Sequence, residues 1–198
     1  MRSRRGAANP RREAYRQTRE ARNSLYLNSR GIRPETLNAP RFRGTWGIDP
    51  RGNLVFAHRD EQGDLTGYEL KNVGFTGFAK GGRKAMWRSR EFPGDTCLVL
   101  VESAIDAYSH GQLFPDKQTR YWSIGGTMSP YQRSLIAAEI KRLPSQMTIV
   151  AGFDSDAAGE SLRAVPQFVA ARDAPQIVEP PERSCLVGGT PGGHVRSP

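Results

Sequence analysis

The sequence predicts an α/β protein whose mainly parallel sheet, with flanking helices, follows a small antiparallel β region and an N-terminal basic helix. Residues 95–180 alternate continuous apolar runs with segments of helical spacing, a pattern typical of βα units. Residues 42–88 form short β-like runs separated by glycines, which indicates antiparallel hairpins. Residues 1–43 hold twelve arginines and three glutamates, so the whole net charge of +9 lies there.

The N-terminal segment is expected to form a surface helix. Asn9 and Pro10 suit the N-cap and N1 positions, and the helix is expected to continue to about Asn28 and close at Gly31. An arginine-rich arm suits contact with a polyanion, because arginines that displace counterions from phosphate give salt-dependent affinity. A solvated basic helix or a poorly ordered tail explains the same composition.

Changes in composition set the expected boundaries. The basic helix or arm takes residues 1–40, a small β-rich region 41–93, the α/β domain 94–181, and a disordered or aberrant tail 182–198. In the β-rich region, "DEQGD" is expected to be a hairpin loop with Gly63 at positive φ. "AMWRS" is expected to be the last run of the antiparallel sheet, and "EFPGD" the hinge after it.

The elements of the α/β domain follow from its apolar runs. "CLVLVE", "RYWSIGG" and "MTIVAGF" are expected strands, and "PQIV" is a candidate last strand. Ser129 and Pro130 suit the N-cap and N1 of a helix that begins "SPYQRSL". "AAGESLRAVPQFVAAR" is expected to be the helix after the third strand.

Several classes of protein are disfavoured by composition. No window approaches the ~20 apolar residues of a membrane span, and the N-terminus lacks the apolar region of a secretory signal. A cytoplasmic protein without a membrane partner is therefore expected. Cys97 and Cys185 have no metal-type spacing, so neither a disulfide framework nor a zinc site is indicated. Cys97 is expected to be a small apolar residue that opens a strand.

Carboxylates follow two of the predicted strands. Glu102 ends "CLVLVE", and Asp154 and Asp156 end "MTIVAGFDSD". Ligands of parallel sheets bind beyond the carboxyl ends of the strands, and side chains two apart on an extended segment face the same side. If the two strands are neighbours, the three carboxylates can share Mg²⁺ or Mn²⁺, which favour oxygen ligands.

Helix capping explains part of the same pattern. Ser155 or Asp156 suits the N-cap of the following helix, and Ser103 with Asp106 has the form of a capping box. Asp106 is therefore either an additional acid of the site or a structural residue. Glu102 is harder to explain by capping, because it follows an apolar run and precedes the cap.

A second candidate site lies between Glu69 and Glu91, where cations alternate with aromatic residues and no acid occurs. Such a surface suits a nucleic-acid strand, with phosphates on the cations and bases on the rings, and "KGGRK" suits a phosphate cradle. Alternatively, the aromatics are core residues and the cations a solvated face. The aromatics are Phe75, Phe78 and Trp87, and the candidate contacts are Lys71, Lys80, Arg83, Lys84 and Arg88.

Two sets of motifs resemble a known family. "VESAIDAYS", followed about fifty residues later by "AGFDSDAAG", resembles the Toprim domain, the metal-binding unit of bacterial primases, topoisomerases and related nucleases. "YLNSRGI", "RFRG", "NLVFAHRDEQGDLTGYELKN" and "FTGFAKGGRKAMW" resemble the primase-like Toprim proteins common on plasmids and in mobilisation regions. The resemblance covers roughly residues 25–181.

The resemblance implies a site and an activity. Glu102 would be the general acid/base of phosphoryl or nucleotidyl transfer, Asp154 and Asp156 would hold Mg²⁺, and the basic region would guide template and nucleotide. The implied protein is a primase-type nucleotidyltransferase acting on single-stranded DNA in plasmid replication or transfer. Implied partners are single-stranded DNA or RNA, nucleotides, and a helicase or relaxase. A Toprim nuclease and a nucleic-acid-binding remnant without chemistry are the alternatives.

The C-terminus departs from the family pattern. In these relatives the last strand and its prolines are followed by a Lys-Asp-Trp-Asn type segment, whereas here "VEPPE" runs into "RSCLVGGTPGGHVRSP". The match stops as a frameshift or truncation would make it stop. An acidic segment that contacts metal or substrate is then expected to be missing.

Overall fold

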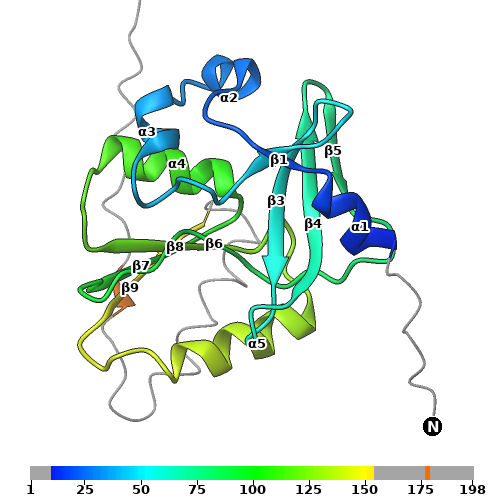
Figure 1. Cartoon of the computed structure of the whole chain (residues 1–198). Helices are drawn as coiled ribbons and strands as arrows, with labels where there is room; N and C mark the ends of the chain where they lie inside the picture. The colour runs from blue at the N-terminus through cyan, green and yellow to red at the C-terminus, as the bar shows by residue number, and fades with distance from the viewer. Residues whose placement is uncertain (1–9, 154–176, 179–198) are drawn as a thin grey trace, which may run out of the picture.

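The computed structural model describes residues 10–153 and 177–178 of the chain. It contains two five-stranded sheets with helices packed around them (Figure 1). The predicted α/β class, with an antiparallel region before a mainly parallel sheet, is confirmed. No helix in these residues is long and apolar enough to cross a membrane.

The first sheet is antiparallel throughout, in the order β1-β2-β3-β4-β5. The predicted hairpin loop joins β3 to β4, and Gly63 has a φ of 80° there. Its N–H donates to the carbonyl of Asp60 over 3.0 Å. The strands are β1 (Arg19–Glu20), β2 (Gly47–Ile48), β3 (Leu54–Arg59), β4 (Leu65–Asn72) and β5 (Phe75–Phe78).

The second sheet is mainly parallel, in the order β10-β9-β7-β8-β6. Neighbouring strands from β10 to β8 run parallel, and only the edge strand β6 runs antiparallel to its neighbour. The short last strand predicted from "PQIV" is confirmed as β10. The strands are β6 (Trp87–Arg88), β7 (Cys97–Val101), β8 (Thr119–Ser123), β9 (Thr148–Gly152) and β10 (Ile177–Val178).

Helices α4 and α5 cover opposite faces of the second sheet, above and below β7 in Figure 1. Val99 and Val101 pack with α4, whereas Leu98 and Leu100 pack with α5. Because alternate residues of a strand face opposite sides, a strand covered on both faces is apolar throughout. The helices are α1 (Pro10–Arg16), α2 (Leu25–Ser29), α3 (Pro34–Asn38), α4 (Ala104–Leu113) and α5 (Pro130–Ile140).

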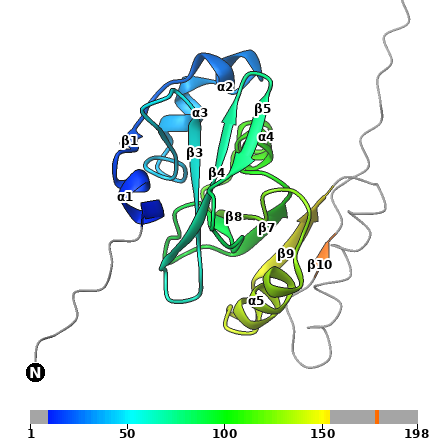
Figure 2. The ribbon, with the colours of Figure 1, turned by 90° about the vertical axis from the view of Figure 1, so that its right-hand side faces the viewer.

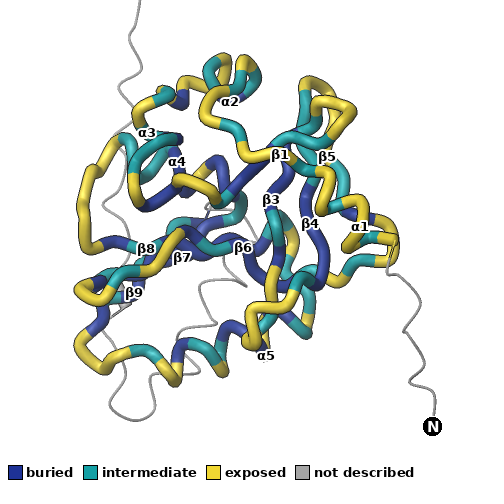
Figure 3. Tube along the Cα trace, viewed as in Figure 1, coloured by how far each residue is buried: buried dark blue, intermediate teal, exposed yellow. Residues whose placement is uncertain are grey.

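The two sheets share a core. The ring of Tyr108 on α4 lies 4.9 Å from that of Phe42, 5.7 Å from Trp87 and 6.3 Å from Phe56 on β3. Figure 2, turned by 90°, shows α4 behind the first sheet, and Figure 3 shows that the buried stretches gather where the two sheets meet. The first sheet is therefore fixed relative to the carboxyl end of β7.

The prediction of a single N-terminal helix that runs to about Asn28 is wrong. α1 ends at Arg16, β1 pairs with β2, and Ser24 caps the separate helix α2. The reason is a close approach at Gly47, where an added Cβ would lie 2.5 Å from Thr18 Cγ2. Pairing at the sheet edge therefore overrides the helical composition of this segment.

The placement of "AMWRS" in the antiparallel sheet is also wrong. Trp87 and Arg88 form β6, which pairs with β8 in the second sheet, and only a single bridge joins Met86 to Arg59. The cause is Trp87, which is 1% exposed in the shared core and donates its indole N–H to the carbonyl of Thr45 over 2.8 Å. This segment thus links the two sheets.

A buried ion pair ties the segment before β2 to the start of β7. Arg41 contacts Asp95 through two hydrogen bonds of 2.8 and 2.5 Å, and Arg120 donates to Asp95 over 3.0 Å. Burial raises the pKa of Asp95, but the hydrogen bond from Arg41 and the charges of both arginines outweigh it. The pKa of Asp95 therefore lies below its ordinary value of 3.8.

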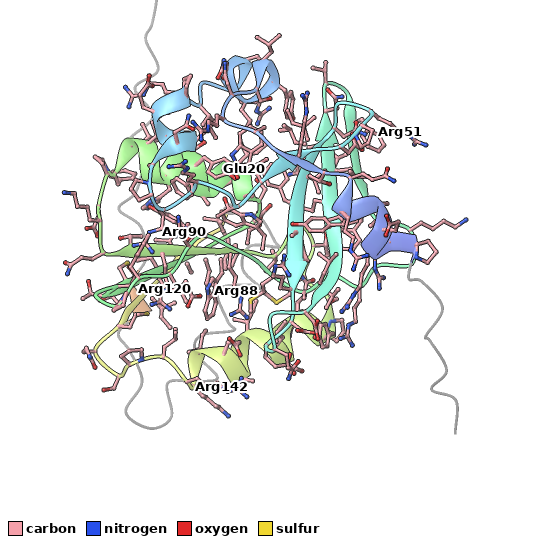
Figure 4. All side chains as sticks on the ribbon, viewed as in Figure 1. Glu20, Arg51, Arg88, Arg90, Arg120 and Arg142 are labelled. Carbon is pink, nitrogen blue, oxygen red and sulfur yellow. The ribbon has the colours of Figure 1, made fainter. Side chains whose placement is uncertain are left out.

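Replacing Arg41 should destabilise the fold strongly. Arg41→Met leaves the Asp95 carboxylate buried without its bidentate partner, and the free energy of unfolding should fall by about 3–5 kcal/mol. Urea denaturation at pH 7 measures it. The control is Arg51→Met. Arg51 is exposed (labelled in Figure 4), and its replacement should change the free energy of unfolding by less than ~0.5 kcal/mol.

The same pair predicts a pH dependence. Because the folded pKa of Asp95 is lowered, its stabilisation is complete above the unfolded value of 3.8 and is lost as the pH falls through the folded value. Asp95→Asn should remove this part of the acid destabilisation. An equal loss of stability on acidification in the wild type and in Asp95→Asn would contradict the assignment.

Candidate metal and nucleic-acid site

Glu102 directly follows the central strand of the second sheet. β7 lies between β8 and β9, and Val101 is paired in register with Ser123 on one side and Gly152 on the other. The two strands that are followed by acidic residues in the sequence, β7 and β9, are thus neighbours, as the metal hypothesis requires. Asp154 and Asp156 lie outside the described residues, so the structure places Glu102 and the strand that leads to the two aspartates.

The backbone of Glu102 is held by the turn after β8. Its carbonyl accepts hydrogen bonds from Ser123 Oγ over 3.1 Å and from the N–H of Gly126 over 2.9 Å. Ser123 is fully buried, and its hydroxyl also accepts from the N–H of Gly125 over 3.2 Å. Residues 123–126, called the 123–126 turn below, therefore fix the backbone from which the Glu102 side chain extends.

The predicted capping box is confirmed at the start of α4. Asp106 Oδ2 accepts from the backbone N–H of Ser103 over 2.9 Å and from its hydroxyl over 2.8 Å. In return, Ser103 Oγ accepts from the N–H of Asp106 over 3.4 Å. Asp106 thus has a structural function at the helix start, and a further role as an additional acid stays a prediction.

The described residues contain no group of three or more His, Cys, Asp and Glu side chains placed to hold a metal ion. They supply one candidate ligand, Glu102, at the carboxyl edge where β7 and β9 end together. An oxygen-only set completed by Asp154 and Asp156 fits the ligand chemistry of Mg²⁺ or Mn²⁺.

A buried pair that the sequence analysis missed lies close to the 123–126 turn. His58 Nε2 is 3.0 Å from Glu69 Oε1, and both side chains are buried. Glu69 pairs with Phe56 across β3 and β4, so His58, two residues further on, lies on the same face of the sheet. Polar residues on the inward face of a hairpin were the signal that could have revealed them.

The five predicted nucleic-acid contacts separate into two groups. Lys80 and Arg83 are exposed, and the Arg83 guanidinium stacks over the ring of Tyr131 at 3.9 Å. The other three are less exposed, and their charged groups bond to other residues of the protein. These are Lys71 with Glu69 at 3.5 Å, Lys84 Nζ with the carbonyl of Gly125 at 2.8 Å, and Arg88 with Glu139 at 3.1 Å.

The three aromatic residues of this region have different environments. Trp87 belongs to the core, as the alternative interpretation expected. Phe78 packs edge-on against His58, with ring centroids 5.2 Å apart. Phe75 on β5 is 47% exposed and is the one of the three with a ring available to a base.

The basic helix α1 lies beside the "KGGRK" turn. The guanidinium of Arg11 donates to the carbonyl of Gly81, and Arg12 forms an ion pair with Asp64 at 2.9 Å. The rings of Tyr15 and Tyr68 lie 5.7 Å apart, which holds α1 on β4. The two basic segments identified in the sequence therefore adjoin in space.

Comparison with known families and structures agrees with this arrangement. Residues 25–95 match the family model DUF3991, described as a protein of unknown function, and residues 99–171 match a Toprim-like model. No curated protein matches the chain.

Among solved structures, the primase fragment of the bacteriophage T7 primase-helicase protein matches at 18% identity with a TM-score of 0.58. The match covers 83% of this chain and 66% of the fragment, so this chain spans slightly less than two thirds of its length. A structure of the T7 lagging-strand DNA polymerase with primase domains, an RNA/DNA hybrid and dTTP matches at 18% identity with a TM-score of 0.54. This match covers 82% of the present chain and 79% of the matched chain. The fold is therefore that of primase Toprim proteins.

The capping box predicts a measurable loss of stability. Ser103→Ala removes the cap of α4 and should lower the free energy of unfolding by about 1 kcal/mol. Ser134→Ala, at an exposed position inside α5, is the matched control and should be neutral or slightly stabilising, because alanine favours helix interiors. Chemical denaturation of both variants measures the difference, and equal effects would contradict a capping role.

Proposed function

We propose that this chain, which has a Toprim-like domain and a primase-type fold, is a Mg²⁺-dependent nucleic-acid protein that joins nucleotides on single-stranded DNA. The observation that supports it best is the parallel pairing of β7 with β9, since both are followed by acids in the sequence. Carboxylates at adjoining strand ends suit phosphoryl-transfer chemistry, because they can hold a divalent cation next to a phosphate.

Each carboxylate has a role in this proposal. Asp154 and Asp156 would bind Mg²⁺ or Mn²⁺, and Glu102 would both contact the cation and act as general acid/base. The bound cation would neutralise charge that develops on the transferred phosphoryl group. Glu102 would accept the proton of the attacking hydroxyl, a function that requires a carboxylate on a fixed backbone. The hydrogen bonds from Ser123 and Gly126 supply that fixed backbone.

The basic residues would guide the polyanion. Lys80 and Arg83 face solvent beside α1, where template phosphates can reach them. Lys84 bonds to the 123–126 turn that holds Glu102, which supports a role for Lys84 in contacting a nucleotide phosphate near the acids. Phe75 would stack a base. Lys71 and Arg88 would contribute positive potential from their places in ion pairs.

The biological setting belongs to the same proposal. The substrates would be nucleotides with single-stranded DNA or RNA, and the process would be plasmid replication or transfer in the cytoplasm. A helicase partner is supported by the likeness to the primase part of a primase-helicase protein, and a relaxase would be the alternative partner. A Toprim nuclease or a binding protein without chemistry would give different products in the experiment below.

The carboxylates should control the response to metal. Mg²⁺ or Mn²⁺ at a hundred times its dissociation constant should stabilise the wild type by about 2.7 kcal/mol. The double variant Asp154→Asn with Asp156→Asn should lose this response, and its metal-free form should be at least as stable because the repulsion is gone. Thermal melting with and without metal measures both effects.

Glu102→Gln separates binding from chemistry. This variant should keep much of the metal response while primer synthesis falls by about 10²–10⁴-fold, because the general acid/base is lost. Primer synthesis is assayed with nucleotides, single-stranded DNA and Mg²⁺. If metal stabilises the wild type but the protein cuts the template, it is a nuclease. If millimolar Mg²⁺ and Mn²⁺ leave the melting temperature of the wild type unchanged, it is a binding protein without chemistry.

DNA binding should depend on salt through the exposed cations. Replacing Lys80 and Arg83 with Gln should weaken binding of single-stranded DNA and reduce the slope of log affinity against log salt by about 0.7 per lost contact. The control replaces two exposed cations outside the arginine-rich N-terminal segment, Arg51 and Lys117, with Gln and should leave the slope unchanged. Fluorescence anisotropy at several salt concentrations measures it, and equal slopes in both variants would exclude Lys80 and Arg83 from the contact.

A further inference from the structure

A buried carboxylate of the first sheet packs against the turn that holds Glu102. Glu69 on β4 is 3% exposed. A Cβ added to Gly125 would lie only 2.8 Å from both Cδ and Oε1 of Glu69, and 3.0 Å from a ring carbon of His58. Gly125 also has a φ of 71°, a conformation that favours glycine. The backbone at Gly125 is thus in direct contact with the His58–Glu69 pair.

Two residues, Gly126 and Lys84, extend the contact between Glu69 and Gly125. Gly126, next in the chain, donates its N–H to the carbonyl of Glu102 over 2.9 Å. Lys84 Nζ bonds to the carbonyl of Gly125, and the charge of Lys84 also acts on Glu69. A continuous set of contacts therefore runs from β4 of the first sheet to the carboxyl end of β7 in the second.

His58 holds the Glu69 carboxylate in one orientation. Its ring is fully buried, and its Nε2 atom forms the hydrogen bond with Glu69 Oε1. Its Nδ1 atom has no hydrogen-bond partner among the described residues. Burial raises the pKa of Glu69, but the hydrogen bond with His58 and the charges of His58, Lys71 and Lys84 outweigh it, so the pKa lies below its ordinary value of 4.5. Glu69 is therefore ionised at neutral pH.

We propose that Glu69, oriented by His58, is a positioning residue that fixes the 123–126 turn and, through it, the backbone of Glu102. A buried polar pair commonly stabilises a fold less than apolar side chains of the same size, and its best-attested benefit is a unique arrangement of its surroundings. Here the pair would specify the position of the Glu102 backbone at the carboxyl end of β7. The catalytic consequence rests on the proposed function, whereas the structural consequence does not.

Hydrogen exchange tests the structural consequence. In Glu69→Ala the amide of Gly126 should exchange about 10-fold faster than in the wild type, because its bond to Glu102 opens locally. Glu69→Gln keeps the shape and the acceptor for His58, so its exchange should stay near that of the wild type. Asp95→Asn is the control, because it weakens the buried Arg41–Asp95 pair, which lies just before the start of β7 and far from Glu102 along this strand. NMR-detected exchange of the Gly126 and Leu100 amides distinguishes local opening from general destabilisation.

Primer synthesis tests the catalytic consequence. Misplacement of Glu102 in Glu69→Ala should lower kcat by about 10- to 100-fold while KM for the nucleotide changes little. Glu69→Gln should restore most of the turnover. A variant that is only less stable would regain its kcat at lower temperature, and Glu69→Ala should not.

A pair of glycine variants gives an independent test. Gly125→Ala introduces a Cβ against Glu69, whereas Gly74→Ala carries a similar φ of 67° with nothing within 4 Å. The difference between them isolates the contact with Glu69 from backbone strain. Gly125→Ala should speed exchange at Gly126 and lower kcat, and Gly74→Ala should do neither.

The outcomes separate the two proposals. If the wild type makes no primer but Gly126 is deprotected only in Glu69→Ala and Gly125→Ala, the proposed function fails and the positioning role stands. Wild-type exchange at Gly126 in both of these variants, or equal acceleration of Gly126 and Leu100, would overturn the positioning role. Loss of kcat in Glu69→Gln equal to that in Glu69→Ala would also overturn it, because the conservative variant keeps the contact.

Discussion

The structure depends on the register of β7 between β8 and β9. Each residue of β7 is paired on both sides, and its alternating side chains are buried against α4 on one face and α5 on the other. A slip by one residue would exchange the valines that pack with α4 for the leucines that pack with α5, so close packing on both faces favours the observed register. That register decides which residues leave the sheet together at its carboxyl edge, and Glu102 is one of them.

The first sheet is more than an attachment to this arrangement. Trp87 and Tyr108 belong to a core that both sheets share, and Arg41 is bound to Asp95 just before β7. Glu69 brings β4 against the 123–126 turn. In the proposed function, a first sheet fixed in this way would present the strand of nucleic acid to Glu102 in a constant position, as alignment of template and nucleotide requires.

Patterns within short segments were sufficient to predict much of this fold. Continuous apolar runs identified β7 and β9, and Ser103 and Ser129 identified two helix starts, because burial on both faces and capping leave local signals. The N-terminal segment was mispredicted, since the pairing of β1 depends on a glycine about thirty residues away. The His58–Glu69 pair was missed because its role appears only when β4 meets the 123–126 turn, a contact between residues distant in sequence.

In the proposed function, a divalent cation would bind where β7 and β9 end. The most direct measurement is the paramagnetic broadening of backbone amide signals by substoichiometric Mn²⁺ in NMR spectra. A cation at this edge should broaden the signals of Glu102, Ser103 and Phe153 strongly. It should broaden those of Cys97 and Thr148 much less, because these residues lie ~16 Å away at the other ends of the two strands. Uniform broadening, or broadening centred on another part of the chain, would exclude a cation site at this edge of the sheet.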